Sequence, residues 1–366
     1  MIAEQTNADR SLQLPPLSFA NVPIGFPVVQ AALSGYSDWP MRVIAKRLGA
    51  DYTLCEVMLD QFLVSLKGRQ RTSHFLHISD EEHPVGGQLM GAEPEQFAAG
   101  AVKLAEAGFD VIDINFGCPV KKVLGRCRGG FHLSQPNVAL EIVRRTRDAV
   151  PPQIPVTLKM RRGIDDSPQS REHFFEILDG AIAAGIAGVT VHGRTVMQRY
   201  NGPSRWAFLT EAVQFVAGRI AVLGSGDLFA AGDCLRMMRE TGVDGVTAAR
   251  GAIGNPWIFS QSRWLASGGT EVRPPSIFEQ RDVMLQHFCL ANELYGDSRA
   301  PLQMRKFGIK YSASHPQWDE IRGEFAKIRS AEDWQRVLDR WYATDGPGQW
   351  APAEAHKTQG GGCEAG

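Results

Sequence analysis

Cysteine is scarce in this chain of 366 residues, and the six present, at positions 55, 118, 127, 234, 289 and 363, include no C-x-x-C pair. Neither a disulfide scaffold nor a zinc site is therefore indicated; we expect no bound metal and a reducing, cytoplasmic environment. The chain also lacks a run of eighteen apolar residues, and its first ten residues carry Glu4 and Asp9 rather than an apolar stretch. We therefore expect neither membrane insertion nor secretion.

An excess of charge of either sign is also missing. The 39 basic and 40 acidic residues give a net charge of -1. This balance excludes a generally basic surface, so any binding of nucleic acid must use local patches. The hydrophobic content of 43% and the charged content of 22% are those of a soluble globular protein, and the length allows a barrel-sized domain plus a smaller one.

Short apolar runs alternate with amphipathic segments from Phe26 onward. We predict strands at Pro27–Ala32, Tyr52–Val57, Pro84–Leu89, Val111–Asn115, Val156–Met160, Gly188–His192, Ile220–Gly224 and Gly245–Ala248. Apolar residues recur at helical spacing in Pro94–Ala107, Val138–Ala149, Glu172–Ala184 and Ala230–Thr241. Strands separated by helices run parallel, so the pattern predicts an α/β fold, a (β/α)8 TIM barrel. A doubly wound sheet would alternate in the same way, but the first turn, Ser34–Asp38, lacks a G-x-G-x-x-G fingerprint.

The segments outside the barrel differ from it in pattern. Residues 1–25 are polar and contain prolines, and we interpret them as a lead-in without a regular element. The barrel is assigned residues 26–266, and a Gly/Ser/Pro-containing linker follows it. Residues 277–343 predict a small all-α domain, with helices at Gln280–Tyr295, Ala300–Ser312, Trp318–Ile328 and Ala331–Tyr342. Residues 345–366, rich in Gly, Pro and Ala, are expected to be disordered.

Polar residues recur where the predicted strands end, which is where a barrel enzyme collects its chemistry. They are Glu56, Gln88, Asn115, Cys118, Lys159, Arg161, His192 and Arg194. Each type has a plainer explanation when it stands alone: a small buried thiol, a lysine that reaches solvent, a core histidine. Their convergence on one face of one barrel favours a functional site.

Cys118 and two glycine-rich turns give that site a chemical character. Pro119 restricts the backbone of Cys118, so the thiol direction is defined, and Lys121 and Lys122 add positive charge beside it. After the seventh and eighth predicted strands come Gly224–Asp227 and Ala249–Gly251. Loops at these positions commonly bind a phosphate, and Arg250 supplies charge. The sequence therefore predicts a phosphorylated cofactor.

Taken together, these motifs resemble those of the dihydrouridine synthase family, flavin enzymes that reduce uridine in RNA, usually transfer RNA. The resemblance runs from Ala31 to about Tyr342 and is strongest over Gln88–Gly91, Asp113–Lys122, Val191–Thr195, Tyr200–Trp206 and Arg250–Phe259. It implies a barrel that binds FMN and a helical domain that helps to bind RNA. The chain departs from the family pattern at Ala31-Ala32-Leu33, usually Ala-Pro-Met, at Ser225-Gly226, usually Asn-Gly, and at Arg126–His132, usually small residues.

The resemblance implies a role for each matching position. FMN contacts fall to Ala32, Leu33, Ser34, Gln88, Asn115, Lys159, His192, Ser225, Gly226, Asp227, Ala249 and Arg250. Cys118 is similar to the family's proton donor: hydride from the reduced flavin would add to C6 of uracil, and the thiol would protonate C5. An unperturbed thiol pKa of about 8.5 suits a donor at neutral pH. NADPH is implied as the reductant.

Basic residues form two clusters in predicted loops at the barrel mouth. One holds Lys67, Arg69 and Arg71, and the other holds Lys121, Lys122, Arg126 and Arg128. We predict that the second cluster, with Arg161 and Arg194, contacts transfer RNA, whose target base must leave its stack to reach a barrel mouth. We expect a monomer. Two alternatives remain open: an FMN barrel oxidoreductase that acts on a small molecule or another RNA, and a non-catalytic RNA-binding relative.

Overall fold

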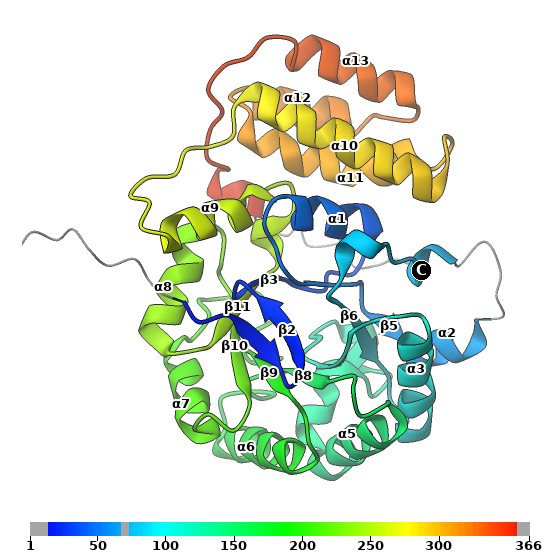
Figure 1. Ribbon diagram of the computed structural model, residues 1–366, viewed down its shortest axis with the longest axis vertical. Coiled ribbons are helices and arrows are strands. Elements are labelled where there is room, and N and C mark those ends of the chain that lie inside the picture. Colours follow the sequence, from blue (N-terminus) through cyan, green and yellow to red (C-terminus); the bar gives the residue numbers. More distant parts are fainter. Residues whose placement is uncertain (1–13, 67–72, 357–366) are drawn as a thin grey trace, which may run out of the picture.

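The computed structural model describes residues 14–66 and 73–356, and its largest unit is a closed barrel of parallel strands surrounded by helices (Figure 1). The sheet order is β4-β3-β11-β10-β9-β8-β7-β6-β5, and β4 also pairs with β6, so that two short strands share one of eight strand positions. The strands are β3 (Val28–Gln30), β4 (Thr53–Leu54), β5 (Met58–Leu59), β6 (Val85–Met90), β7 (Val111–Phe116), β8 (Val156–Arg161), β9 (Gly188–His192), β10 (Ala221–Ser225) and β11 (Gly245–Ala248). This arrangement confirms the predicted TIM barrel.

The second strand position departs from the prediction of one strand over residues 52–57. The chain leaves the ladder between β4 and β5, where the Glu56 backbone N–H donates to the carbonyl of Ser37 (3.2 Å). The Glu56 carboxylate also accepts a hydrogen bond from the Gly35 N–H at 2.7 Å. These bonds to the first loop replace strand pairing and split the strand in two.

Helices cover the outside of the barrel and pack on its strands through apolar residues. They are α1 (Trp39–Arg47), α3 (Pro94–Glu106), α5 (Pro136–Ala149), α6 (Pro168–Ala183), α7 (Ala207–Val216), α8 (Ala231–Thr241) and α9 (Trp257–Ala266), with the short α2 (Asp60–Ser65) and α4 (Lys121–Leu124) in loops. Proline in the first turn starts α1, α3, α5 and α6, where a missing N–H costs no hydrogen bond. In the described part of the chain, no helix is long and apolar enough to span a membrane.

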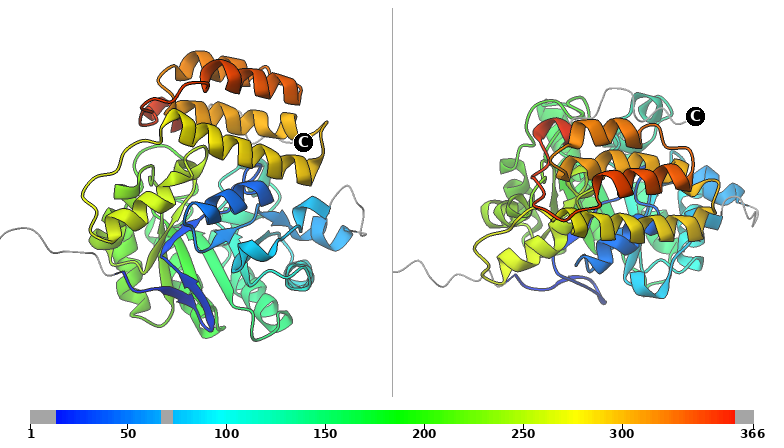
Figure 2. Two further views of the ribbon diagram at one scale, coloured as in Figure 1. Left: turned by 45° about the horizontal axis from the view of Figure 1, so that its top comes forward. Right: turned by 90° about the horizontal axis from the view of Figure 1, so that it is seen from above.

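A bundle of four helices lies against α1 at the end of the barrel where the strands finish (Figure 2). It comprises α10 (Ile277–Tyr295), α11 (Ala300–Tyr311), α12 (Trp318–Phe325) and α13 (Ala331–Trp341). Ser276 and Ser330 cap α10 and α13 by accepting backbone N–H bonds, and the core contains the buried rings of Phe325 and Trp334. The bundle confirms the predicted all-α unit.

Two expectations about the ends of the chain need correction. The lead-in contains an antiparallel hairpin, β1 (Leu17–Phe19) and β2 (Val22–Gly25), which buries Leu17, Phe19 and Ile24 in one cluster with Val111 at the start of β7. Residues 345–356, expected to be disordered, are hydrogen-bonded to the helical bundle, for example through Gln349 N–H and the Ser314 carbonyl (2.8 Å). Residues 357–366 lie outside the described part.

Candidate active site

Cys118 follows the carboxyl end of β7 in a turn fixed by the strand itself. The Asn115 side-chain oxygen accepts a hydrogen bond from the Gly117 N–H at 2.8 Å, which bends the chain as soon as the strand ends. Pro119 then restricts the backbone that carries the thiol. The Cys118 side chain is half-buried. The turn therefore presents a defined thiol at the mouth of the barrel.

A second segment closes over Cys118 from the side. The Gly130 N–H donates to the Cys118 carbonyl over 3.0 Å, and Gly129 has a φ of +58°. A Cβ at Gly129 would lie 2.8 Å from the Cβ of Cys118. Glycine is required at this position both by the left-handed backbone and by the close approach. The cysteine is thus held between two parts of the same loop.

Below the thiol, a chain of buried hydrogen bonds links three neighbouring strands. The Asp113 carboxylate accepts from Thr157 Oγ1 (2.6 Å) and from Gln88 Nε2 (2.7 Å). Gln88 Oε1 in turn accepts from Asn115 Nδ2 at 2.7 Å. Burial raises the pKa of Asp113, while the bonds from Thr157 and Gln88 oppose that shift. The network fixes which amide atoms of Gln88 and Asn115 are engaged.

A cavity of about 640 Å³ opens above this network, between the strand ends and the helical bundle. Cys118 lines it, and so does every residue predicted to contact FMN: Ala32, Leu33, Ser34, Gln88, Asn115, Lys159, His192, Ser225, Gly226, Asp227, Ala249 and Arg250. The structure therefore brings the predicted cofactor residues and the predicted proton donor into one space.

Two cations on β8 carry positive charge into the cavity. Burial, reinforced by neighbouring Arg161, lowers the pKa of Lys159 to about 8. Burial also lowers the pKa of Arg161 to about 10, but this guanidinium remains charged at neutral pH. Arg161 is held by the backbone carbonyls of Gly117 (2.9 Å) and Thr195 (2.9 Å). Both cations act electrostatically on Cys118, which places them near the thiol.

His192 differs from these cations because it is neutral. The residue is 9% exposed, and burial together with the charges of Arg161 and Lys159 holds the pKa of its ring well below the usual range. Nδ1 accepts a hydrogen bond from the Arg194 backbone N–H at 3.1 Å. The proton of the neutral ring is therefore assigned to Nε2, and His192 serves as a hydrogen-bond donor rather than as a charge.

The turn after β10 forms a concave backbone surface. Gly226 has a φ of +114°, and a Cβ there would overlap Ser204 Oγ and lie 3.1 Å from the His192 ring. Asp227 anchors the turn, because its carboxylate accepts from the Ser204 N–H (2.7 Å) and pairs with Arg194 (2.8 Å). A glycine at positive φ in a turn after a strand is a feature of anion-binding loops.

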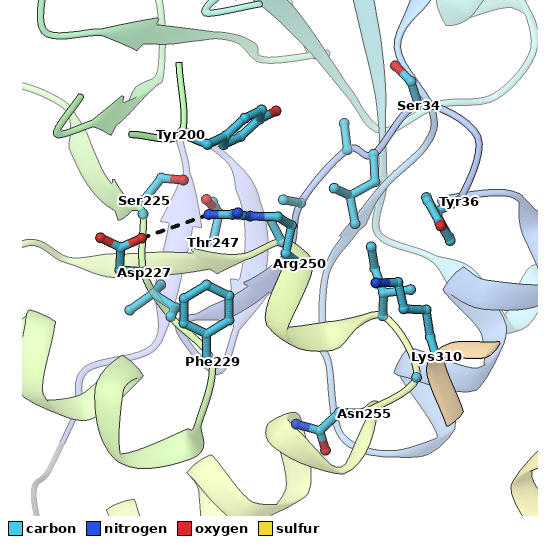
Figure 3. A pocket seen from close by; sticks show the side chains of 18 of the residues that line it. Ser34, Tyr36, Tyr200, Ser225, Asp227, Phe229, Thr247, Arg250, Asn255 and Lys310 are labelled. Atoms are coloured by element: carbon cyan, nitrogen blue, oxygen red, sulfur yellow. Dashed lines mark ion pairs between the residues drawn. The ribbon is translucent and has the colours of Figure 1, made fainter. Parts of the chain in front are cut away.

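Arg250 supplies the cation beside this turn. Figure 3 shows its guanidinium between the rings of Tyr200 and Phe229, whose centroids lie 4.7 Å and 5.3 Å from the guanidinium carbon. Its distance to the Asp227 carboxylate is 3.8 Å. The two rings fix the side chain while the charge stays available to a ligand.

The residues predicted to contact RNA separate into two groups. Lys121, Lys122 and Arg126 are exposed on α4 and the turn after it. Arg128, which we predicted to contact RNA, is buried, and its guanidinium donates to Gln61 Oε1 at 2.6 Å. Arg161 and Arg194 are also buried, and they bond to groups of the protein itself. Lys67, Arg69 and Arg71 lie outside the described residues.

Sequence reasoning assigned no role to several residues of the site. Asp113 and Thr157 stand two positions before Asn115 and Lys159, on the same face of their strands, so a search with period two would have found them. Lys310 and Arg322 reach the cavity from the helical bundle, and nothing in the sequence pairs them with the barrel. Among the described residues, no group of three His, Cys, Asp or Glu side chains could hold a metal ion.

The geometry can be compared with known proteins. The family model described as dihydrouridine synthase matches residues 29–344. The chain belongs to the dihydrouridine synthase family. Among curated members, it is 33% identical over 306 residues to a probable tRNA-dihydrouridine synthase of Rickettsia typhi, with 84% of this chain and 91% of that protein covered. It is 32% identical to tRNA-dihydrouridine synthase B of Xanthomonas axonopodis pv. citri, with 86% and 92% covered.

Solved structures that resemble this dihydrouridine synthase family member show the fold alone. The first is 2-naphthoyl-CoA reductase in complex with 2-naphthoyl-CoA, with a TM-score of 0.57 at 10% identity; 70% of this chain is covered, but only about half of the reductase, 52%. The second is morphinone reductase in complex with tetrahydroNAD, with a TM-score of 0.51 at 11% identity, covering 73% and 93%. The family and these neighbours agree on a TIM barrel.

Proposed function

We propose that this chain reduces a uridine of transfer RNA to 5,6-dihydrouridine, with FMN as the bound cofactor and NADPH as the reductant. The observation that carries the proposal is a single cavity lined both by the half-buried Cys118 and by the glycine turn Ser225–Asp227 with Arg250. Membership of the family, and relatives named as tRNA-dihydrouridine synthases, support it.

The residues that line the cavity fit FMN. Thr247 Oγ1 is buried and has no hydrogen-bond partner among the described residues, although its side chain lines the cavity. Gly226 leaves no space for a Cβ but exposes its backbone, and Arg250 can pair with a phosphate. We assign the ring contacts to Gln88, Asn115, Lys159 and His192, and the phosphate contacts to Ser225, Gly226, Asp227 and Arg250. When bound and reduced, FMN would supply the hydride that uracil C6 receives.

Cys118 completes the reduction by protonating C5. The Sγ–H bond breaks, its proton forms the new C–H bond at C5, and a thiolate remains. The nearby ammonium of Lys159 and guanidinium of Arg161 stabilise that negative charge. Because the side chain is half-buried and lines an open cavity, the thiolate can regain its proton from solvent.

Exposed cations next to Cys118 would bring the RNA to the cavity. Lys121, Lys122 and Arg126 follow the thiol within eight positions and face solvent, where they can neutralise backbone phosphates. The uridine must leave its stack to reach a thiol at a barrel mouth. We expect the protein to act on transfer RNA in the cytoplasm and to be a monomer.

The experiment is an anaerobic titration of the purified protein. We expect a flavin absorbance spectrum that bleaches with NADPH and recovers when unmodified transfer RNA is added, with dihydrouridine detected by mass spectrometry of the digested RNA. A flavin that bleaches but ignores the RNA would replace this proposal with a small-molecule or other RNA substrate. A protein that binds no FMN would point to the non-catalytic relative.

A further inference from the structure

Two cations of the helical bundle line the same cavity as Cys118. Lys310 comes from α11 and Arg322 from α12, and Figure 3 shows Lys310 below Arg250. Within residues 14–66 and 73–356, neither pairs with a carboxylate within 4 Å. Burial lowers the pKa of Lys310, and the nearby charges of Arg322 and Arg250 lower it further. We call Lys310 and Arg322 the cationic rim; it presents positive charge without a compensating anion.

The chain returns to this rim after α13. Figure 1 shows the last segment running from α13 down to the space between the bundle and the barrel. Residues Asp345–His356, here called the strap, follow the last residue that the family model matches, residue 344. The strap is therefore a feature of this chain beyond the part that defines the family.

The first half of the strap is anchored to the bundle. Asp345 Oδ1 accepts from the Phe278 N–H (3.0 Å), and the Gly346 carbonyl accepts from the Ile277 N–H (3.0 Å). Gln349 donates through its backbone to the Ser314 carbonyl (2.8 Å) and through Nε2 to the Ala313 carbonyl (3.2 Å). These bonds fix residues 345–349 at the base of α10 and the end of α11.

The second half of the strap lies over the rim and is held weakly. Ala351, Glu354 and Ala355 line the cavity, and Glu354 is exposed. In the part of the chain that the structure describes, one hydrogen bond joins residues 351–356 to the rest of the protein, from Lys310 Nζ to the Ala355 carbonyl at 3.0 Å. A carbonyl is a weaker partner for an ammonium group than a phosphate is.

We propose that the outer strap, residues 351–356, competes with RNA for the cationic rim: Lys310 and Arg322 bind a backbone phosphate of the substrate RNA, and the outer strap leaves when they do. The inference rests on the proposed function, since it takes RNA as the substrate. An anchored inner half and a single bond in the outer half allow this exchange without loss of the bundle's packing. The Glu354 carboxylate opposes the approach of a phosphate until the strap has moved.

Two shortened proteins test the proposal. One ends at Trp350 and lacks the outer strap; its matched control ends at His356 and lacks only residues 357–366. For the protein that ends at Trp350, we expect the KM for transfer RNA and the Kd measured by filter binding to be about three- to tenfold lower than for the full chain. The reason is that RNA no longer has to displace the outer strap from the cationic rim. The control should match the full chain. The FMN content of the three purified proteins should be the same, because none of them changes Ser225–Asp227 or Arg250.

Lys310→Ala tests whether removal of the outer strap acts by freeing the cationic rim or by a general loosening of the structure around the cavity. It should raise the KM for transfer RNA, and ending the chain at Trp350 should give no further gain in that background, because the contested cation is gone.

If the Trp350-ended protein loses flavin or solubility, Glu354→Gln in the full chain should still lower the KM about twofold. An unchanged or raised RNA Kd in the Trp350-ended protein, or in Glu354→Gln, overturns the proposal. A full chain that binds transfer RNA but forms no dihydrouridine would instead contradict the proposed function, while the Kd comparison would still test the strap.

Discussion

The two walls of the cavity are held by different kinds of interaction. The barrel wall is a buried network in which Asp113, Gln88 and Asn115 bond to one another at 2.7 Å. The helical wall consists of Lys310 and Arg322, with one hydrogen bond to the outer strap in the described part of the chain. A buried, fully bonded network resists rearrangement, whereas a partly solvated cation exchanges partners readily. We therefore expect changes in the barrel wall to alter the rate of reduction and changes in the helical wall to alter RNA affinity.

The largest effect is expected for Cys118→Ala. Loss of the proton donor should slow the single-turnover formation of dihydrouridine about a hundred- to ten-thousandfold, while flavin content and RNA affinity persist. Cys127→Ala is the matched control, because Cys127 is an exposed cysteine of the same loop. Its rate should equal that of the unaltered protein. If Cys118→Ala formed dihydrouridine at close to the rate of the unaltered protein, Cys118 would not be the proton donor. The assignment of the reduction rate to the barrel wall would then be contradicted as well.

Asp113→Asn should disrupt the hydrogen-bond network of the barrel wall without changing RNA affinity. The carboxylate accepts from Thr157 and Gln88, and an amide would present its own N–H groups to one of these donors. The unpaired buried group costs about 1–3 kcal/mol of stability. The displaced Gln88 should slow single turnover about tenfold or more.

The matched control for this change is Thr157→Ser, which keeps the hydroxyl donor to Asp113. Its single-turnover rate should stay close to that of the unaltered protein, and its free energy of unfolding should fall by about 1 kcal/mol for the buried methyl group that it loses. An Asp113→Asn protein with a normal single-turnover rate and weakened RNA binding would show that the network supports RNA affinity rather than the rate of reduction.

The polar residues at the strand ends of the barrel wall could be predicted from sequence, whereas Asp113 and Thr157, two positions earlier on the same strands, were assigned no role. Each strand is a short apolar run, and a polar residue at its end stands out, as Lys159 does after Val156–Leu158 and His192 does after Val189–Val191. The predicted bounds of the strands at Gly188–His192 and Gly245–Ala248 are confirmed without change. Local pattern is sufficient here because parallel strands meet at one end of a barrel.

The helical wall could not be predicted, because contacts between distant segments create it. The strap is rich in Gly, Pro and Ala, which signals the lack of a core of its own, but the bonds from the Gln349 backbone to Ser314 and from its side chain to Ala313 have no sequence signature. The burial of Arg128 could not be predicted for a similar reason. Its charge suggests an exposed residue, yet the fold brings Gln61 close enough to accept its hydrogen bond.

Arg128→Ala tests whether a cation can belong to the barrel wall. Arg128 bonds to Gln61 at 2.6 Å and precedes Gly129, which packs on Cys118, so it positions the loop around the thiol. We expect single turnover to slow about three- to tenfold and the alkylation rate of Cys118 to change, with RNA affinity preserved. The exposed Arg126→Ala should do the reverse: lower RNA affinity and leave turnover at saturating RNA intact. The opposite pattern would place Arg128 among the RNA contacts.

The last prediction compares one lysine from each wall, Lys159 and Lys310, by how the free energy of unfolding depends on pH. The folded pKa of Lys159 is about 8, below the roughly 10.4 of an unfolded lysine, so between these values the unfolded chain holds a proton that the folded chain lacks. The free energy of unfolding of the flavin-free protein should therefore rise with pH over this window, by up to about 3 kcal/mol. Lys159→Met should be more stable than the unaltered protein at neutral pH and lose this advantage by about pH 10. Lys310→Met should show a weaker form of the same trend, because Lys310 donates to the Ala355 carbonyl of the strap, which favours the charged amine. Urea unfolding at a series of pH values measures both, and equal pH dependence in the unaltered and Lys159→Met proteins would mean that Lys159 is solvated and not part of a dry wall.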